Sequence, residues 1–269
     1  MRKSWKEALS WLGILGIALI VFFPIGWGFK TSVTAPLGVG GTSSGTVHLQ
    51  SYQYILSQPE FMLYVKNSLI ITLGAVLITL PMATFGGYAL ARFEFPGKRF
   101  GVLLMVLPLL PAIAVLVPLI IYMRIVGLYN TLGAVVLANV VFNVPFAVWM
   151  ARGFILSIPA EIEEAAAIDG CSRLGILWRV SLPLSAPGLI AVGIFILINS
   201  WNNYLYAFAF TTTPKLRVLP QAILSFLGAW GTNYGGLTAA STLAMIPPVV
   251  LFLIFQKWFI MGMLAGSGK

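Results

Sequence analysis

Apolar runs of about 20 residues recur along the chain, and they constrain its fold more than any other feature. A run of that length is what an α-helix needs to cross the hydrocarbon core of a bilayer. Charged residues make up 9% of the chain, whereas a soluble globular domain carries roughly 25%. The sequence therefore predicts an all-α, polytopic membrane protein.

Six transmembrane helices account for the apolar runs. Their expected ranges are 8–29, 67–91 (capped by Asn67 or Ser68), 101–123, 132–150, 186–208 and 238–259. Prolines fall inside several of them, and we expect Pro247–Pro248 to break the sixth. The expected organisation is an N-terminal transmembrane helix with an external loop over residues 1–66, which includes a short amphipathic helix near 52–57, followed by a transmembrane domain over residues 67–269.

The basic residues predict the orientation of these helices. With the amino terminus inside, eleven of the 16 Lys and Arg residues lie on inner segments and five on outer segments. Basic residues favour the cytoplasmic side of a membrane. Because they are scattered singly, without a basic stripe, the net charge of +9 does not indicate a nucleic-acid partner. We therefore expect both termini in the cytoplasm.

A charged segment from Ser157 to Pro183 interrupts the apolar pattern. It holds four of the seven acidic residues of the chain, Glu161, Glu163, Glu164 and Asp169. Four charges at the centre of a bilayer would cost about 10 kcal/mol on insertion scales. The segment must therefore lie outside the membrane, and the charge bias places it on the cytosolic side.

This segment has the signals of a short helix over residues 159–170. Pro159 suits a first helical turn, the acids favour the positive end of the helix dipole, and Gly170 suits the C-terminal cap. We expect a second helical segment at 172–180 that Pro183 stops before the next span. These residues alone leave two interpretations open: an ordinary loop between spans, or a helix that docks on a partner.

The spacing of the segment resembles a known signature. Glu164-Ala165-Ala166, Gly170 and Val180-Ser181-Leu182-Pro183 match the EAA pattern E-A-A-x3-G-x9-I-x-L-P of ABC importer permeases, with Val in place of Ile. The stretches IPAEIEEAAAIDG, WNNYLYAFAF and QKWFIMGMLAGSGK resemble the sugar-uptake branch. Over nearly its whole length, the chain is similar to MalG-like permease subunits of binding-protein-dependent carbohydrate ABC importers.

This resemblance implies a type I ABC importer permease fold in the plasma (inner) membrane of a prokaryote. It also implies a cytosolic coupling helix that docks on a separate ATPase. The residues that it assigns to coupling are Glu161, Glu164, Ala165, Ala166, Asp169, Gly170, Leu182 and Pro183. The implied partners are a second homologous permease, two cytosolic ABC ATPase subunits and an extracytoplasmic solute-binding protein.

No catalytic or metal site is expected in the chain. Its tail ends in GSGK but lacks the spacing and the Ser/Thr of a Walker A loop, so ATP and Mg are expected only on the partner ATPase. The single cysteine, Cys171, and the single histidine, His48, exclude a disulfide and disfavour a metal site or an enzyme. The expected spans hold no Asp or Glu, which disfavours an ion-coupled carrier. An ATP-independent channel or secondary carrier remains the alternative of a different class.

A few amides and aromatic rings within the spans are candidates for the solute path. Such groups suit a neutral, hydroxyl-rich solute such as a sugar, and another polar solute remains open. The alternative is structural: hydrogen bonds between helices worth about 0.6 kcal/mol each, or anchoring at the membrane interface. The candidates are Asn139, Asn143, Asn199, Trp201, Asn202, Asn203, Tyr204 and Tyr206. Sugar-uptake relatives often carry an acidic residue where Asn203 stands.

Overall fold

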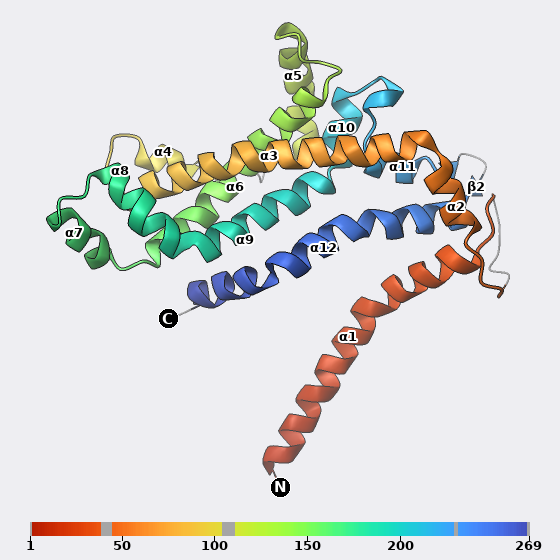
Figure 1. Cartoon of the computed structure of the whole chain (residues 1–269), viewed down its shortest axis with the longest axis horizontal. Helices are drawn as coiled ribbons and strands as arrows, with labels where there is room; N and C mark the ends of the chain where they lie inside the picture. Colours follow the sequence, from red (N-terminus) through yellow and green to blue (C-terminus); the bar gives the residue numbers. More distant parts are fainter. Residues whose placement is uncertain (1, 39–44, 104–110, 229–230, 268–269) are drawn as a thin grey trace. The chain divides into compact units, whose positions relative to one another are not determined.

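The computed structural model describes residues 2–38, 45–103, 111–228 and 231–267, which fold almost entirely into helices (Figure 1). In chain order the elements are α1 (Arg2–Thr34), α2 (Gln50–Ser57), α3 (Pro59–Arg92), α4 (Lys98–Leu103), α5 (Ala112–Ile125), α6 (Leu132–Leu156), α7 (Ala160–Ile168), α8 (Arg173–Ile176), the π-helix η2 (Leu177–Ser181), α9 (Leu182–Trp201), α10 (Tyr204–Phe210), the 3-10 helix η3 (Pro214–Leu216), α11 (Leu219–Leu224), β1 (Leu227–Gly228), β2 (Gly231–Thr232) and α12 (Tyr234–Ser267). The two strands pair antiparallel as a small hairpin.

Five helical segments of the described residues are long and apolar enough to cross a membrane. They are Ser10–Thr34, Pro59–Arg92, Leu132–Leu156, Arg173–Trp201 and Tyr234–Trp258, and α5 is a shorter apolar helix. This confirms the prediction of an all-α, multi-pass membrane protein. The expected third span, 101–123, includes residues 104–110 with Pro108, which lie outside the described residues. Its described parts are the end of α4 and most of α5, and α5 continues through Pro118.

The chain forms two compact units. The first comprises residues 1–62 with 222–246, and the second comprises residues 63–221 with 247–269. In the first unit, the end of α1 packs on the expected amphipathic helix α2, where the Ser32 and Tyr52 hydroxyls lie 2.6 Å apart. Gly235 of α12 lies against them, since a Cβ there would stand 2.8 Å from Ser51 Oγ. These contacts join the segment after the first span to the start of the last.

Helix α6 is the centre of the second unit and packs against α3, α9 and α10. Small residues allow the helices to approach closely, as is usual between membrane helices. A Cβ on Gly87 of α3 would stand 2.8 Å from the backbone nitrogen of Arg152, and a Cβ on Gly188 of α9 would stand 2.2 Å from Phe154 Cγ. Alanines of α3 and α6 and larger aliphatic side chains of α9 fill the core between these crossings.

The start of the second span differs from the prediction. Helix α3 begins at Pro59, so Asn67 and Ser68 lie inside it and do not cap it. Asn67 Nδ2 instead donates to the carbonyls of Lys215 and Arg217 at 2.9 and 2.8 Å, and Ser68 Oγ accepts from Leu219 N at 2.9 Å. These two side chains provide hydrogen-bond partners for the backbone of the loop after α10, whose polar groups would otherwise be buried without partners.

The fifth span was also predicted wrongly as one helix over 186–208. Helix α9 ends at Trp201, and α10 begins at Tyr204 after a break at Asn202–Asn203. Asn203 adopts an extended conformation and its side chain accepts from Tyr206 N at 2.9 Å, which makes it the N-cap of a new helix. Asn199, Asn203 and Tyr206 therefore do not share one helical face.

Three prolines expected to stop or break helices do not do so. The helical segment before Pro183 passes into α9 through the π-helix η2, in which Leu182 N bonds to Leu177 O. A wider turn of this kind lets a helix continue past a residue that lacks an N–H. Helix α12 likewise runs through Pro247 and Pro248. In lipid, an unwound backbone would leave more groups without partners than the prolines do.

The close approach of α3 and α6 predicts opposite effects for two alanine substitutions. Gly87→Ala places a methyl group against backbone that cannot move aside, so we expect it to destabilise the protein by about 1–3 kcal/mol. Gly193→Ala in α9 meets only Leu80 Cδ2 at an ordinary 3.6 Å, and the better helix propensity of alanine should stabilise it by up to about 1 kcal/mol. Thermal unfolding of both variants in detergent checks this prediction, and equal melting temperatures would contradict it.

Candidate functional site

Helix α7 lies within the expected range and is bounded by the residues that the sequence indicated. Pro159 is its N-cap, and Glu161 and Glu163 lie in its first turn. At its end Gly170 has a φ of +85°, a left-handed conformation that glycine adopts without steric cost. Cys171 N bonds to Ala166 O and Gly170 N to Ala167 O, the hydrogen-bond pair of a Schellman motif. The chain therefore reverses sharply after α7.

A buried carboxylate fixes α7 to the rest of the second unit. Glu163 Oε1 lies 3.0 Å from Arg92 Nε at the end of α3, with side-chain exposures of 11% and 12%. The same oxygen accepts a hydrogen bond from Ser181 Oγ at 2.8 Å. Removing one partner of such a buried pair typically costs about 3–5 kcal/mol, because the other charge is left without compensation.

The guanidinium group of Arg92 also holds the end of α6. Its Nη2 donates to the carbonyls of Ile155 at 2.9 Å and Ile158 at 2.8 Å. The C-terminal carbonyls of a helix carry the negative end of its dipole and favour a cation there. Arg92 thus connects α3, α6 and α7, and Ser181 adds the start of α9 through η2.

The sequence alone does not predict this ion pair. Glu163 is one of the four acids of the charged segment, and Arg92 is one of the eleven basic residues expected on inner segments. The available signal was positional: Arg92 ends an apolar span on the same side of the membrane as the acidic segment. No spacing rule, however, links residues 92 and 163.

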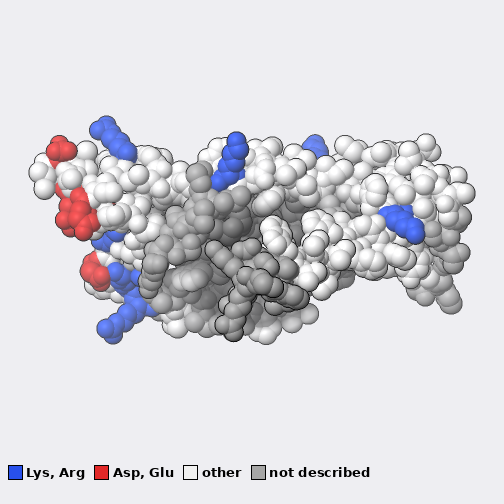
Figure 2. All heavy atoms as spheres, turned by 90° about the horizontal axis from the view of Figure 1, so that it is seen from below, with Lys and Arg blue, Asp and Glu red and all other residues white. Residues whose placement is uncertain are grey.

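The other acids of the segment face outward. Glu161, Glu164, Ala165 and Asp169 are exposed, and Ala166 is half-buried. Two large apolar side chains stand beside them without cover from this chain, Ile168 at 86% and Leu174 at 65% exposure. Figure 2 shows acidic side chains gathered at the α7 end of the second unit, with basic side chains next to them. A mixed acidic and apolar surface outside the membrane is typical of a protein interface.

The second half of the signature packs inward. Leu182 is half-buried and contacts the cluster of Tyr88, Ile155 and Leu177, whereas Pro183 is exposed. Of the eight predicted coupling residues, Ala166 and Leu182 are therefore half-buried and the other six are exposed.

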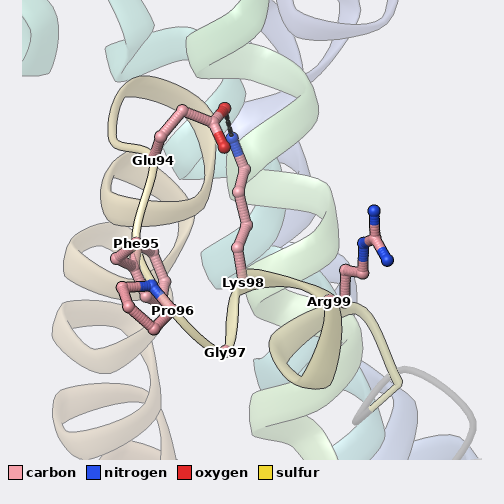
Figure 3. A pocket seen from close by; sticks show the side chains of 6 residues that line it. All are labelled: Glu94, Phe95, Pro96, Gly97, Lys98 and Arg99. Carbon is pink, nitrogen blue, oxygen red and sulfur yellow. Dashed lines mark hydrogen bonds and ion pairs between the residues drawn. The ribbon is translucent and has the colours of Figure 1, made fainter.

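The turn between α3 and α4 forms a shallow hollow close to the ion pair. Residues 94–99 line it, and Lys98 Nζ pairs there with Glu94 (Figure 3). The side chain of Arg99 points away from this pair. Because one sequence stretch supplies the whole lining, the hollow is a feature of the turn. In the described part of the chain, no three His, Cys, Asp or Glu side chains are grouped to hold a metal.

The two asparagines of α6 make structural contacts. Asn139 and Asn143 are buried, and their Nδ2 atoms donate to the carbonyls one turn earlier, each at 2.8 Å. Asn143 Nδ2 also lies 3.4 Å from Ser200 Oγ of α9. These contacts favour the interpretation as polar links within and between helices.

The remaining solute-path candidates divide between buried and accessible positions. Trp201 and Tyr206 are buried, and the Tyr206 ring stacks on Phe142 with centroids 4.8 Å apart. Asn203 and Tyr204 are half-buried at the start of α10. Asn199 and Asn202 are exposed at the end of α9. Of the eight candidates, these last two amides are the most accessible.

The apolar helices and the charged segment between two of them define a multi-pass membrane protein. The chain belongs to the family of binding-protein-dependent transport system inner membrane components, whose model matches residues 80–264. The matched region includes Arg92, α7 and Ser181. This confirms the family that the EAA signature indicated.

Similar proteins support the same family and fold. The chain is 34% identical to the arabinooligosaccharides transport system permease protein AraQ of Halalkalibacterium halodurans, over 100% of both chains. It is 32% identical to the trehalose/maltose transport system permease protein MalG of Thermococcus litoralis, over 98% of this chain and 97% of the relative. Its fold matches a chain of a bacterial ABC transporter involved in alginate import, with a TM-score of 0.76 at 22% identity over 96% of this chain and 98% of that one. The expected type I permease fold is thereby confirmed.

The left-handed conformation of Gly170 leads to a prediction about the end of α7. Gly170→Val should cost about 1–2 kcal/mol locally, because a β-branched side chain is strained at positive φ. Gly153→Ala in α6, where a Cβ meets nothing within 4 Å, is the matched control. Hydrogen exchange measured over residues 160–171 should be faster in the Gly170 variant only. Equal exchange in both variants would show that the turn tolerates a side chain.

Proposed function

We propose that this chain is a permease subunit of an ATP-driven importer that moves a carbohydrate into the cytoplasm. The carbohydrate is an oligosaccharide or a similar sugar or polyol, because the similar proteins AraQ and MalG belong to transport systems for arabinooligosaccharides and for trehalose and maltose. The proposed orientation has both termini and α7 in the cytoplasm of a prokaryotic cell, in line with the distribution of basic residues.

One observation carries the coupling part of this proposal. Helix α7 and its C-cap expose Glu164, Ile168 and Asp169 outward, while Glu163 anchors the helix inward to α3 and η2. Ile168 at 86% and Leu174 at 65% exposure add apolar area to the outward acids, and an exposed apolar surface rimmed by polar groups supports a docking role. A partner with an apolar cleft and basic groups would cover this surface.

The proposed partners follow from this arrangement and from the family. Two cytosolic ABC ATPase subunits bind and hydrolyse ATP, one of them against α7. A second homologous permease completes the membrane pathway, and an extracytoplasmic binding protein delivers the sugar. The chain itself supplies the membrane helices and the docking surface, and ATP hydrolysis occurs on the partner subunits.

Reconstitution in proteoliposomes with the candidate partners tests the docking surface. Glu164→Ala and Ile168→Ser should each weaken ATPase binding by about 2 kcal/mol, roughly 30-fold in affinity, if both act as interface anchors. Uptake of maltose, trehalose or arabinooligosaccharides should fall with binding. Glu60→Ala, which removes an exposed acid at the start of α3, should behave as wild type.

Three outcomes would overturn parts of this proposal. Wild-type uptake and ATPase binding in both α7 variants would show that α7 does not dock. Uptake by the wild-type chain without ATP and without partner subunits would favour a channel or a secondary carrier. Transport of a different polar solute alone would leave the importer in place and correct its substrate.

The accessible asparagines lead to a separate prediction on solute recognition. Asn199→Ala and Asn202→Ala should raise the sugar concentration for half-maximal uptake about three- to tenfold, the effect of one lost hydrogen bond. Their melting temperatures should stay close to wild type, since both side chains are exposed.

Asn143→Ala is the comparison variant for this measurement. It should lower stability by about 0.6 kcal/mol through the lost contact with Ser200 and leave half-maximal uptake unchanged. The reverse pattern, with an effect on uptake at residue 143 and none at residues 199 and 202, would place the sugar beside α6.

A further inference from the structure

The geometry points to Arg92 as a positioning residue: we propose that it sets the orientation of α7 through Glu163 and transmits movement of α7 to the spans. This inference rests on the proposed docking role of α7. Arg92 lies at the last position of α3, and its guanidinium group, which is nearly buried, faces three backbone or side-chain oxygens.

Each nitrogen contact of Arg92 joins a different part of the fold. Nε faces the Glu163 carboxylate on α7 at 3.0 Å. Nη2 reaches the Ile155 carbonyl within α6 and the Ile158 carbonyl in the turn directly before Pro159. The turn that leads into α7 and the first part of α7 itself are therefore fixed to α3 by one rigid planar group.

The carboxylate of Glu163 extends this link to α9. Ser181 is buried in η2 and donates to Glu163 Oε1 at 2.8 Å, and its carbonyl accepts from Ser185 Oγ at 2.6 Å. Since η2 is continuous with α9, a displacement of Glu163 acts on α3 and α9 together. Among the described residues, Glu163 is the α7 acid that is tied to the spans by an ion pair and a hydrogen bond, so this inward carboxylate is the route for the movement.

The shape of arginine is part of the argument. A lysine at position 92 would keep the charge, but a single ammonium group does not reproduce the fork that serves both carbonyls and the carboxylate. Arg92→Lys should therefore weaken the positioning of α7 partially, whereas Arg92→Gln should release it and leave Glu163 buried without a counter-charge.

Hydrogen exchange on the full-length chain in lipid nanodiscs tests the positioning without any partner. The variants are Arg92→Gln, Arg92→Lys and Glu163→Gln. Arg99→Gln is the matched control, because it removes an exposed cation in the same turn region (Figure 3). Exchange over residues 160–168 should be about tenfold faster or more in Arg92→Gln and intermediate in Arg92→Lys. Exchange over residues 135–150 should match wild type.

The result that overturns the inference is wild-type exchange of α7 in Arg92→Gln and Glu163→Gln. If Arg92→Gln loses protection throughout the chain, the variant has failed to fold, and Arg92→Lys and Glu163→Gln then decide. Faster exchange confined to α7 in those two variants supports the positioning role, and unchanged exchange contradicts it.

A second measurement separates positioning from simple stabilisation. In the reconstituted importer, Arg92→Lys should lower the sugar transported per ATP hydrolysed about fivefold, while the ATPase subunits still copurify with the permease. A purely structural role would lower the amount of assembled complex and leave this ratio unchanged. Arg99→Gln should keep the wild-type ratio.

The two proposals fail in different ways. If the wild-type chain transports sugar with ATP and Arg92→Lys keeps the wild-type ratio, the positioning role is wrong and the proposed function stands. If the wild-type chain shows no ATP-driven transport with any candidate partner, the proposed function is wrong, and the exchange experiment still measures whether Arg92 positions α7.

Discussion

The ion pair between Arg92 and Glu163 is the interaction on which the charged end of the second unit depends. A buried charge pair stabilises little by itself, because desolvation offsets most of the attraction. Its value lies in geometry: both charges must stay paired, so the helices that carry them keep one arrangement. The pair thereby converts a loop between two spans into a surface with a fixed orientation, which a helix of nine residues could not maintain alone.

Much of this organisation could be predicted from the sequence because the bilayer restricts the choices. Apolar runs had to become helices, and a segment with four acids had to lie outside. The bounds of α7 could also be predicted, because Pro159 and Gly170 favour a helix start and a helix end through their own backbone conformations. The EAA spacing alone indicated the family.

The failures had two causes: distant partners at Asn67 and Glu163, and an unrecognised helix cap at Asn203. Asn67 was interpreted as a helix cap because the residues next to it in the sequence give no sign of its hydrogen bonds to the loop at 215–217. Asn203 looked like part of a helical face, although its side chain caps the next helix. Glu163 and its neighbour Glu164 are chemically the same, and only the fold makes one an anchor and leaves the other exposed.

The π-helix η2 has a geometric consequence for α9. It adds one residue to a turn, so every later side chain is rotated by about 100° from where an unbroken α-helix would place it. Because of this rotation, Gly188 and Val192 lie on the face of α9 that contacts α6 and the core beside it. Deleting a single residue between 177 and 181 would therefore turn a different stripe of α9 towards α6. In this protein, the nine-residue interval in the EAA signature therefore determines which face of α9 points towards α6, as well as the distance between α7 and α9.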